Sequence, residues 1–127
     1  VCRKVKKMRN ELWKKCVAFH GHECGGLTIG FQAALYAIEL LGLEADEKGC
    51  ISGDEELVCI AENDACGIDA IQVILGCSVG KGNLLFHIRG KQAFLSIIEK
   101  WEICASGIKT NTGRYEQSRL LCLFPKP

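Results

Sequence analysis

The sequence predicts a single domain that mixes helices and strands, of the α+β class, on three observations. The chain has 127 residues, which is enough to bury one hydrophobic core but not two. Apolar side chains recur at helical spacing in its first third. Short apolar runs separated by glycine-rich turns, a pattern typical of strands, follow from residue 57 onward. We therefore expect one domain over residues 1–127.

Two helices are expected at the start of the chain. The first is amphipathic and ends near Ala18. Its apolar positions recur every three or four residues between charged ones: Val5, Met8, Leu12 and Cys16. The second is a broad, alanine-rich stripe from Leu27 to Leu41. Gly25-Gly26 precedes this stripe, and Gly42 follows it as a suitable C-cap.

The second half is expected to combine strands with one further helix. The apolar runs 57–61 and 84–88 predict strands, and a helical pattern between them ends at Gly76. Residues 93–98 fit either another strand or a short helix. The run 120–124 is compatible with an edge strand.

Composition argues against several classes of protein. Sixteen Lys and Arg nearly balance fifteen Asp and Glu, so the net charge of +1 attracts neither nucleic acid nor an anionic membrane. No stretch approaches the roughly 18 apolar residues of a membrane helix, and no secretory segment is visible. The nine cysteines are odd in number and include no Cys-x-x-Cys pair, unlike a secreted disulfide scaffold. We expect a cytoplasmic protein with reduced thiols, as in an anaerobe.

The segment His20-Gly21-His22-Glu23-Cys24 carries the strongest functional signal. In extended backbone, alternate side chains point to one face, so His20, His22 and Cys24 could present two imidazoles and a thiolate together. That donor set suits zinc and other late first-row metals. Cys24 also precedes a helix start, where exposed N–H groups stabilise a thiolate. The alternative is a purely structural interpretation, with two surface histidines and a half-buried cysteine.

A second polar segment, Glu62 to Asp69, follows the first expected strand and opens a helix, a place where ligands often bind. Cys66 could complete the first site as a fourth metal ligand or act as a second catalytic thiol. Asn63 and Asp64 are candidates for substrate binding, but capping or packing explains them and Asp69 better.

The third segment, Gly76 to Asn83, matches only part of the phosphate-binding loop motif. It has three residues instead of four before Gly80-Lys81, no Ser or Thr afterwards, and a helix-to-strand context. Lys81 and Asn83 are candidates for binding an anionic substrate group, with a structural turn as an equal alternative. His87 stands alone on a strand and is expected to be structural.

With all three segments in order, the sequence resembles the FmdE-like family, which takes its name from a component of formylmethanofuran dehydrogenase, over about residues 12–100. The tail 101–127 does not show the resemblance, and Gly25 stands where the family usually has Pro. The matching motifs are Phe19-His20-Gly21-His22-Glu23-Cys24-Gly25-Gly26, Glu62-Asn63-Asp64-Ala65-Cys66-Gly67-Ile68-Asp69-Ala70-Ile71-Gln72, Gly76-Cys77-Ser78-Val79-Gly80-Lys81-Gly82-Asn83-Leu84 and Gly90-Lys91.

The resemblance implies a thioredoxin-like core, with a mixed β-sheet flanked by helices, that assembles as a homodimer. It also implies a divalent metal at the His-x-His-x-Cys segment. Some relatives accompany the molybdenum or tungsten enzyme that fixes carbon dioxide onto methanofuran, a reaction related to methanogenesis. Longer relatives carry a C-terminal zinc-finger domain with Cys-x-x-Cys pairs, and this sequence contains no such pair.

Three functional hypotheses follow, and whether the protein is an enzyme stays open. The first is a metal-binding protein with zinc, nickel or iron on His20, His22, Cys24 and Cys66. The second is a thiol-redox or cysteine-nucleophile enzyme that uses Cys24 without metal, with Cys66 as the resolving thiol. The third is a non-catalytic accessory subunit of a molybdenum or tungsten oxidoreductase.

Overall fold

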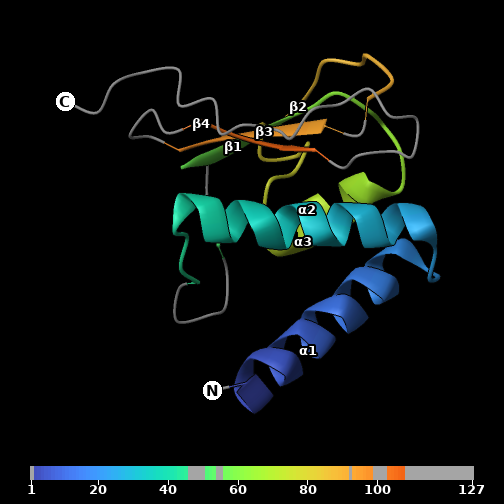
Figure 1. The fold of residues 1–127 in the computed structure, drawn as a ribbon. Coiled ribbons are helices and arrows are strands. Elements are labelled where there is room, and N and C mark those ends of the chain that lie inside the picture. The colour runs from blue at the N-terminus through green and yellow to red at the C-terminus, as the bar shows by residue number, and fades with distance from the viewer. Residues whose placement is uncertain (1, 46–50, 54–55, 92, 99–102, 108–127) are drawn as a thin grey trace.

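The computed structural model describes residues 2–45, 51–53, 56–91, 93–98 and 103–107. Figure 1 shows helices below a mixed sheet, with α2 and α3 next to the sheet and α1 packed on their far side. The elements in chain order are α1 (Cys2–His20), α2 (Gly25–Leu41), β1 (Leu57–Ala61), α3 (Gly67–Leu75), β2 (Leu84–Phe86), β3 (Ala93–Ile98) and β4 (Ile103–Gly107).

The four strands described form one sheet in the order β2-β1-β3-β4. β1 and β2 are parallel and are connected through α3, whereas β3 is antiparallel to both β1 and β4. Helices packed on a mixed sheet confirm the predicted α+β class. The closer likeness to a thioredoxin core stays a prediction.

The core lies between β1, α2 and α3. Alternate residues of β1 are buried, as expected for a strand with one face against helices. The buried apolar side chains from the helices and strands fill the space between them, and the largest fully buried ones are Phe94, Leu27, Leu57, Ile71 and Leu75. This packing fixes the two helix starts that bear cysteines, since both helices contribute to the same core.

Helices α2 and α3 approach so closely that their backbones touch at Gly30 and Gly67. A Cβ atom on Gly30 would lie 2.1 Å from the Gly67 carbonyl oxygen, a distance that no real Cβ contact allows. A Cβ on Gly67 would lie 3.1 Å from the Gly30 Cα and 3.2 Å from the Gly26 carbonyl oxygen. Glycine is therefore required at this crossing by steric exclusion. The residue before Gly67 is Cys66, so the crossing also positions that thiol.

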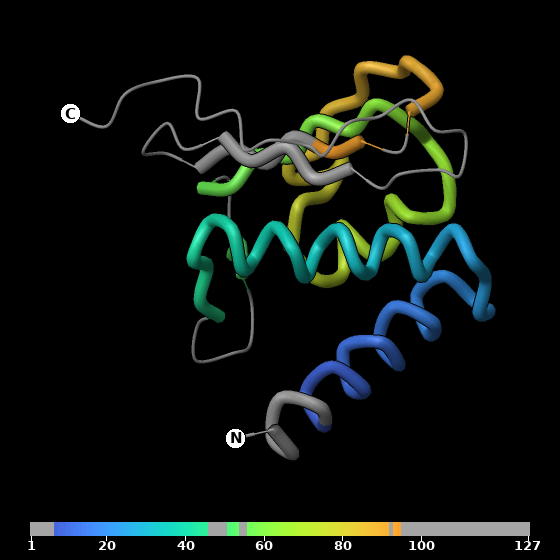
Figure 2. Tube along the Cα trace, in the orientation of Figure 1, coloured from blue at the N-terminus to red at the C-terminus, as the bar shows by residue number. Residues whose placement is uncertain are grey.

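Most predicted elements are confirmed within two residues of their ends, but the first helix differs at the point that matters for the site. It continues past Ala18 to His20 and stops at Gly21, whose φ of 96° favours glycine and whose N–H bonds the Val17 carbonyl at 2.7 Å. The prediction that His20 lies in extended backbone was therefore wrong. Figure 2 shows the chain reversing direction through residues 21–24.

The other differences lie in the sheet. β2 ends at Phe86 instead of residue 88, and 93–98 is a strand because it pairs with β1 along its whole length. β4 was not predicted at all. The expected edge strand at 120–124 lies outside the described residues. None of the helices in the described ranges is long and apolar enough to cross a membrane.

Replacing Gly30 by Ala is expected to lower the free energy of unfolding by about 1–3 kcal/mol, because the helices must separate to admit the methyl group. Urea unfolding followed by circular dichroism measures this change. Gly25→Ala is the matched control, since its Cβ would meet nothing within 4 Å. Equal unfolding midpoints for the two variants would contradict the close crossing.

Candidate metal and thiol site

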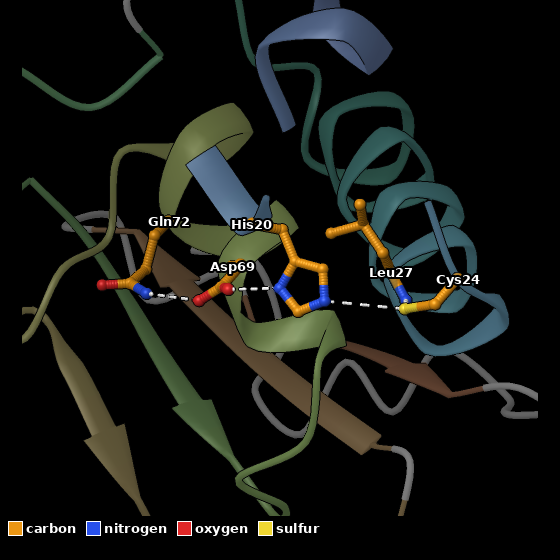
Figure 3. Close-up of polar contacts among 5 residues, drawn as sticks. All are labelled: His20, Cys24, Leu27, Asp69 and Gln72. Atoms are coloured by element: carbon orange, nitrogen blue, oxygen red, sulfur yellow. Dashed lines mark hydrogen bonds and ion pairs between the residues drawn. The ribbon is translucent and has the colours of Figure 1, made fainter. Parts of the chain in front are cut away.

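The site lies where α1 ends and α2 and α3 begin. His20 is the last residue of α1, Cys24 immediately precedes α2, and Cys66 immediately precedes α3. Three helix termini therefore converge on one place, where N–H groups of two helix starts are available to negative charge. In Figure 3 the His20 ring lies between Asp69 on one side and Cys24 on the other.

Cys24 is the N-cap of α2. Its backbone is extended, and its sulfur accepts the N–H of Leu27 at 3.3 Å, the role that a Ser or Asp oxygen plays in most helix caps. This hydrogen bond is the main cause of a lowered pKa for the Cys24 thiol. Hydrogen bonds from His20 and Cys66 lower that pKa further, against an opposing effect of burial. The thiolate is therefore favoured at a pH where an ordinary cysteine is protonated.

His20 is oriented by Asp69, which lies in the first turn of α3. The imidazole Nδ1 donates to the Asp69 Oδ2 at 2.6 Å, and the Gln72 amide donates to the other carboxylate oxygen at 3.3 Å. The bond to Asp69 is the largest cause of a raised pKa for His20, which burial opposes and the Cys24 sulfur reinforces. With the proton on Nδ1, the Nε2 atom faces Cys24 with its Sγ at 3.6 Å.

Three side chains meet closely enough to share one metal ion. Candidate ligand atoms of His20, His22 and Cys24 all lie within 4.8 Å of one another, and the two imidazole centroids are 4.6 Å apart. A tetrahedral zinc with ordinary zinc–nitrogen and zinc–sulfur bonds would separate its N and S ligands by about 3.6 Å. The distance from His20 Nε2 to Cys24 Sγ has that value, so the donor set fits a metal ion.

Cys66 lies beside this group. A Cβ atom on Gly26 would be 3.0 Å from the Cys66 Cβ, 3.6 Å from the Cys66 Sγ and 4.0 Å from the Cys24 Sγ. A hydrogen bond with the Cys24 sulfur is the largest cause of a raised pKa for the Cys66 thiol. One thiol of the pair is therefore proton donor and the other acceptor. The cluster within 4.8 Å does not include Cys66.

Asn63, one of the predicted substrate-binding residues, is hydrogen-bonded to nearby loops. The Asn63 amide donates to the Lys91 carbonyl at 2.9 Å and accepts the Ala65 N–H, which makes it a turn residue. Asp64 is exposed. These contacts shape the loop around the start of α3, and a role of either residue in substrate binding stays a prediction.

Asn83 and Lys81 organise the loop between α3 and β2. The buried Asn83 side chain accepts the Ser78 N–H at 2.9 Å and donates to the Leu57 carbonyl at 2.9 Å. The Lys81 ammonium donates to the Ser52 carbonyl at 2.9 Å. Hydrogen bonds of this kind account for a structural turn, and anion binding by these two residues stays a prediction.

Asp69 is the residue of the site whose role the sequence did not reveal. Its segment stood out as polar, but capping or packing was the better explanation for Asp69 itself. The available signal is that Asp69 and Gln72 are polar residues, three apart, in a helix whose other residues are almost all apolar. Residues at that spacing share a helix face, so this polar stripe marks a surface that contacts something other than the core.

Comparison with known proteins places the chain in a family. The family described as FmdE, molybdenum formylmethanofuran dehydrogenase operon, matches residues 19–119. The chain belongs to the FmdE family. The match begins just before His20 and extends past residue 100 into the tail, further than the sequence motifs had indicated. His20, Cys24 and Cys66, which the structure brings together, therefore all lie inside the FmdE domain.

One curated relative of this FmdE-family chain comes from Archaeoglobus fulgidus. It is named a probable S-adenosyl-L-methionine-binding protein and is 31% identical over 110 residues. The alignment covers 85% of this chain but 30% of the relative. The chain thus spans less than a third of that protein's length, and the shared part includes most of this domain.

Cys24 is expected to react with iodoacetamide with a midpoint below pH 9.0, the ordinary value, because its lowered pKa makes the thiolate available at lower pH. His20→Gln should raise the midpoint, since it removes a hydrogen bond and a positive charge from the sulfur. Peptide mass spectrometry after timed alkylation gives the rate at each cysteine.

Cys16 and Cys77 are internal controls in the same experiment. Burial raises the pKa of each to about 11, so both should stay unmodified while Cys24 reacts. A Cys24 midpoint at or above 9.0, unchanged by His20→Gln, would show that the described hydrogen bonds do not stabilise its thiolate.

Proposed function

We propose that the chain is a metal-binding protein that holds one divalent cation, zinc in the first place, on His20, His22 and Cys24. The observation that supports this proposal most directly is the clustering of one sulfur and two imidazole ligands within 4.8 Å. Two nitrogens and a thiolate form a donor set that zinc prefers, and nickel or iron can use the same set. Cys66 is the candidate for a fourth ligand, because its sulfur lies beside that of Cys24.

The residues around the cluster act as a supporting shell. A histidine ligand that donates its other N–H to a carboxylate keeps a fixed tautomer and orientation, and Asp69 provides that carboxylate. The start of α2 stabilises the sulfur as thiolate, which is the form that binds metal. His22 is exposed, so the cluster faces solvent on that side. With an open coordination position, a bound metal would supply Lewis acidity or an activated water.

Metal binding is expected to fall sharply when a ligand is removed. Cys24→Ser and His20→Ala should each lose most of the metal found in the parent protein, measured by elemental mass spectrometry after anaerobic purification. Asp69→Asn should weaken affinity by about 10- to 100-fold without abolishing binding, since it removes the support and keeps the ligands. Competition with a chromogenic chelator measures that affinity.

Two matched variants control for nonspecific effects. Cys77→Ser replaces a buried cysteine bonded to the Leu57 carbonyl, and His87→Ala replaces an exposed histidine bonded to Arg89. Both should keep the parent's metal content. If the parent takes up no zinc, nickel or iron even after reconstitution, or if the controls lose metal as the ligand variants do, the proposal is wrong.

The Archaeoglobus relative favours a second candidate ligand, S-adenosyl-L-methionine, because 85% of this chain aligns with the protein of that name. Equilibrium dialysis against labelled S-adenosyl-L-methionine tests it directly, with S-adenosylhomocysteine and adenosine as competitors. Saturable binding at one site per chain would support this candidate. Retention no greater than that of an unrelated protein would reject this candidate for this chain.

A further inference from the structure

The arrangement of Cys24 and Cys66 goes beyond what metal binding requires. Each thiol lies at the start of a different helix, and the two are 42 positions apart in the sequence. The sulfur of Cys24 caps its own helix, whereas Cys66 makes no side-chain cap bond to α3. The Cys66 sulfur instead lies beside that of Cys24, since both are within 4.0 Å of the position of a Cβ on Gly26. Both sulfurs thus lie at the gap between the two helix starts.

Gly26 leaves room beside these two thiols. The position of a Cβ on Gly26 lies 3.0 Å from the Cys66 Cβ, and it lies 3.6 Å and 4.0 Å from the two sulfurs. A methyl group there would press on the Cys66 side chain and stand beside both sulfurs. A disulfide needs its two Cβ atoms about 3.8 Å apart. The two cysteine side chains must therefore be able to approach each other without an atom in the way.

The helix crossing holds the two thiols near each other. Gly30 and Gly67 touch one turn beyond Gly26 and one residue beyond Cys66, so neither helix start can shift far without breaking that contact. Because the two helix starts cannot move apart in the reduced protein, each thiol has a high effective concentration relative to the other. The crossing therefore favours a bond between this particular pair.

We propose that Cys24 and Cys66 form a redox-active dithiol that exchanges with low-molecular-weight disulfides. This activity does not rest on metal binding, although it uses the same sulfur. Because Cys24 is shared, the disulfide form and the metal-bound form exclude each other.

The exchange takes two displacement steps. The Cys24 thiolate attacks one sulfur of the small disulfide, forms a mixed disulfide and releases the first thiol. The Cys66 sulfur then attacks the Cys24 sulfur, forms the Cys24–Cys66 bond and releases the second thiol. Two protein thiols are oxidised and one disulfide is reduced to two thiols, which take up the two protons that the cysteines lose.

The test uses the whole protein, purified without oxygen and incubated with glutathione disulfide over a series of glutathione ratios. After acid quenching, alkylation and digestion, mass spectrometry identifies the linked peptides. We expect the Cys24–Cys66 pair to form first, with loss of about two free thiols per chain. Cys66→Ser should stop at the mixed disulfide between Cys24 and glutathione, whereas Cys77→Ser should behave as the parent does.

Two glycine variants test the geometry without altering a thiol. Gly26→Ala places a methyl group against Cys66 and should slow formation of the Cys24–Cys66 bond by about tenfold or more. Gly25→Ala adds the same methyl group one residue earlier, where nothing lies within 4 Å, and should leave the rate unchanged.

Peptide mapping of the unaltered protein decides the proposal even if a variant fails to fold. A first disulfide between any other cysteines, or no disulfide at all, overturns it. So does equal loss of thiols in Cys66→Ser and the parent. Zinc uptake measured on the same reduced sample separates the two ideas: zinc binding without the disulfide rejects the dithiol alone, and the disulfide without zinc binding rejects the metal site alone.

Discussion

The contact between the backbones of α2 and α3 at Gly30 and Gly67 is the constraint from which the geometry of the site follows. Because no side chain separates the helices there, the start of each helix lies at a fixed distance from the other. Cys24 and Gly26 stand within two turns of the crossing on α2, and Cys66 stands next to it on α3. This steric contact therefore brings together two thiols that are remote in sequence, and no bond between the thiols is needed for it.

The hydrogen bond between His20 and Asp69 extends this geometry to α1. It joins the last residue of the first helix to the first turn of the third, at 2.6 Å, and so determines which imidazole nitrogen faces Cys24. The carboxylate and the sulfur act on opposite sides of one ring, and each stabilises the imidazolium form. The ring in turn stabilises the thiolate, so the three groups form one electrostatic unit and no member of it can be removed without changing the others.

Sequence alone predicted the parts of this structure that depend on local patterns. The extent of α2, the cap at Gly42, β1 and the end of α3 at Gly76 follow from periodicity and glycine placement, which act over a few residues. The clustering of His20, His22 and Cys24 was also predicted, but for the wrong reason, because a helix end and a turn bring them together. The pairing of Asp69 with His20 could not be predicted, since it depends on how two helices pack whose bonded residues are 49 apart in sequence. β4 was missed because its own sequence is weakly patterned, and its pairing with β3 cannot be read from that sequence alone.

A single sulfur, that of Cys24, is shared among the possible uses of the site, and this sharing limits what the site can do at one time. In the described structure it accepts the Leu27 N–H, faces the imidazole and lies beside the Cys66 thiol. A metal ion would take the place of the contact with the imidazole, and it would compete with protons at both ligands. A disulfide would remove the sulfur from the imidazole and from the metal together, so the occupied, reduced and oxidised forms are alternatives set by metal supply, pH and thiol balance.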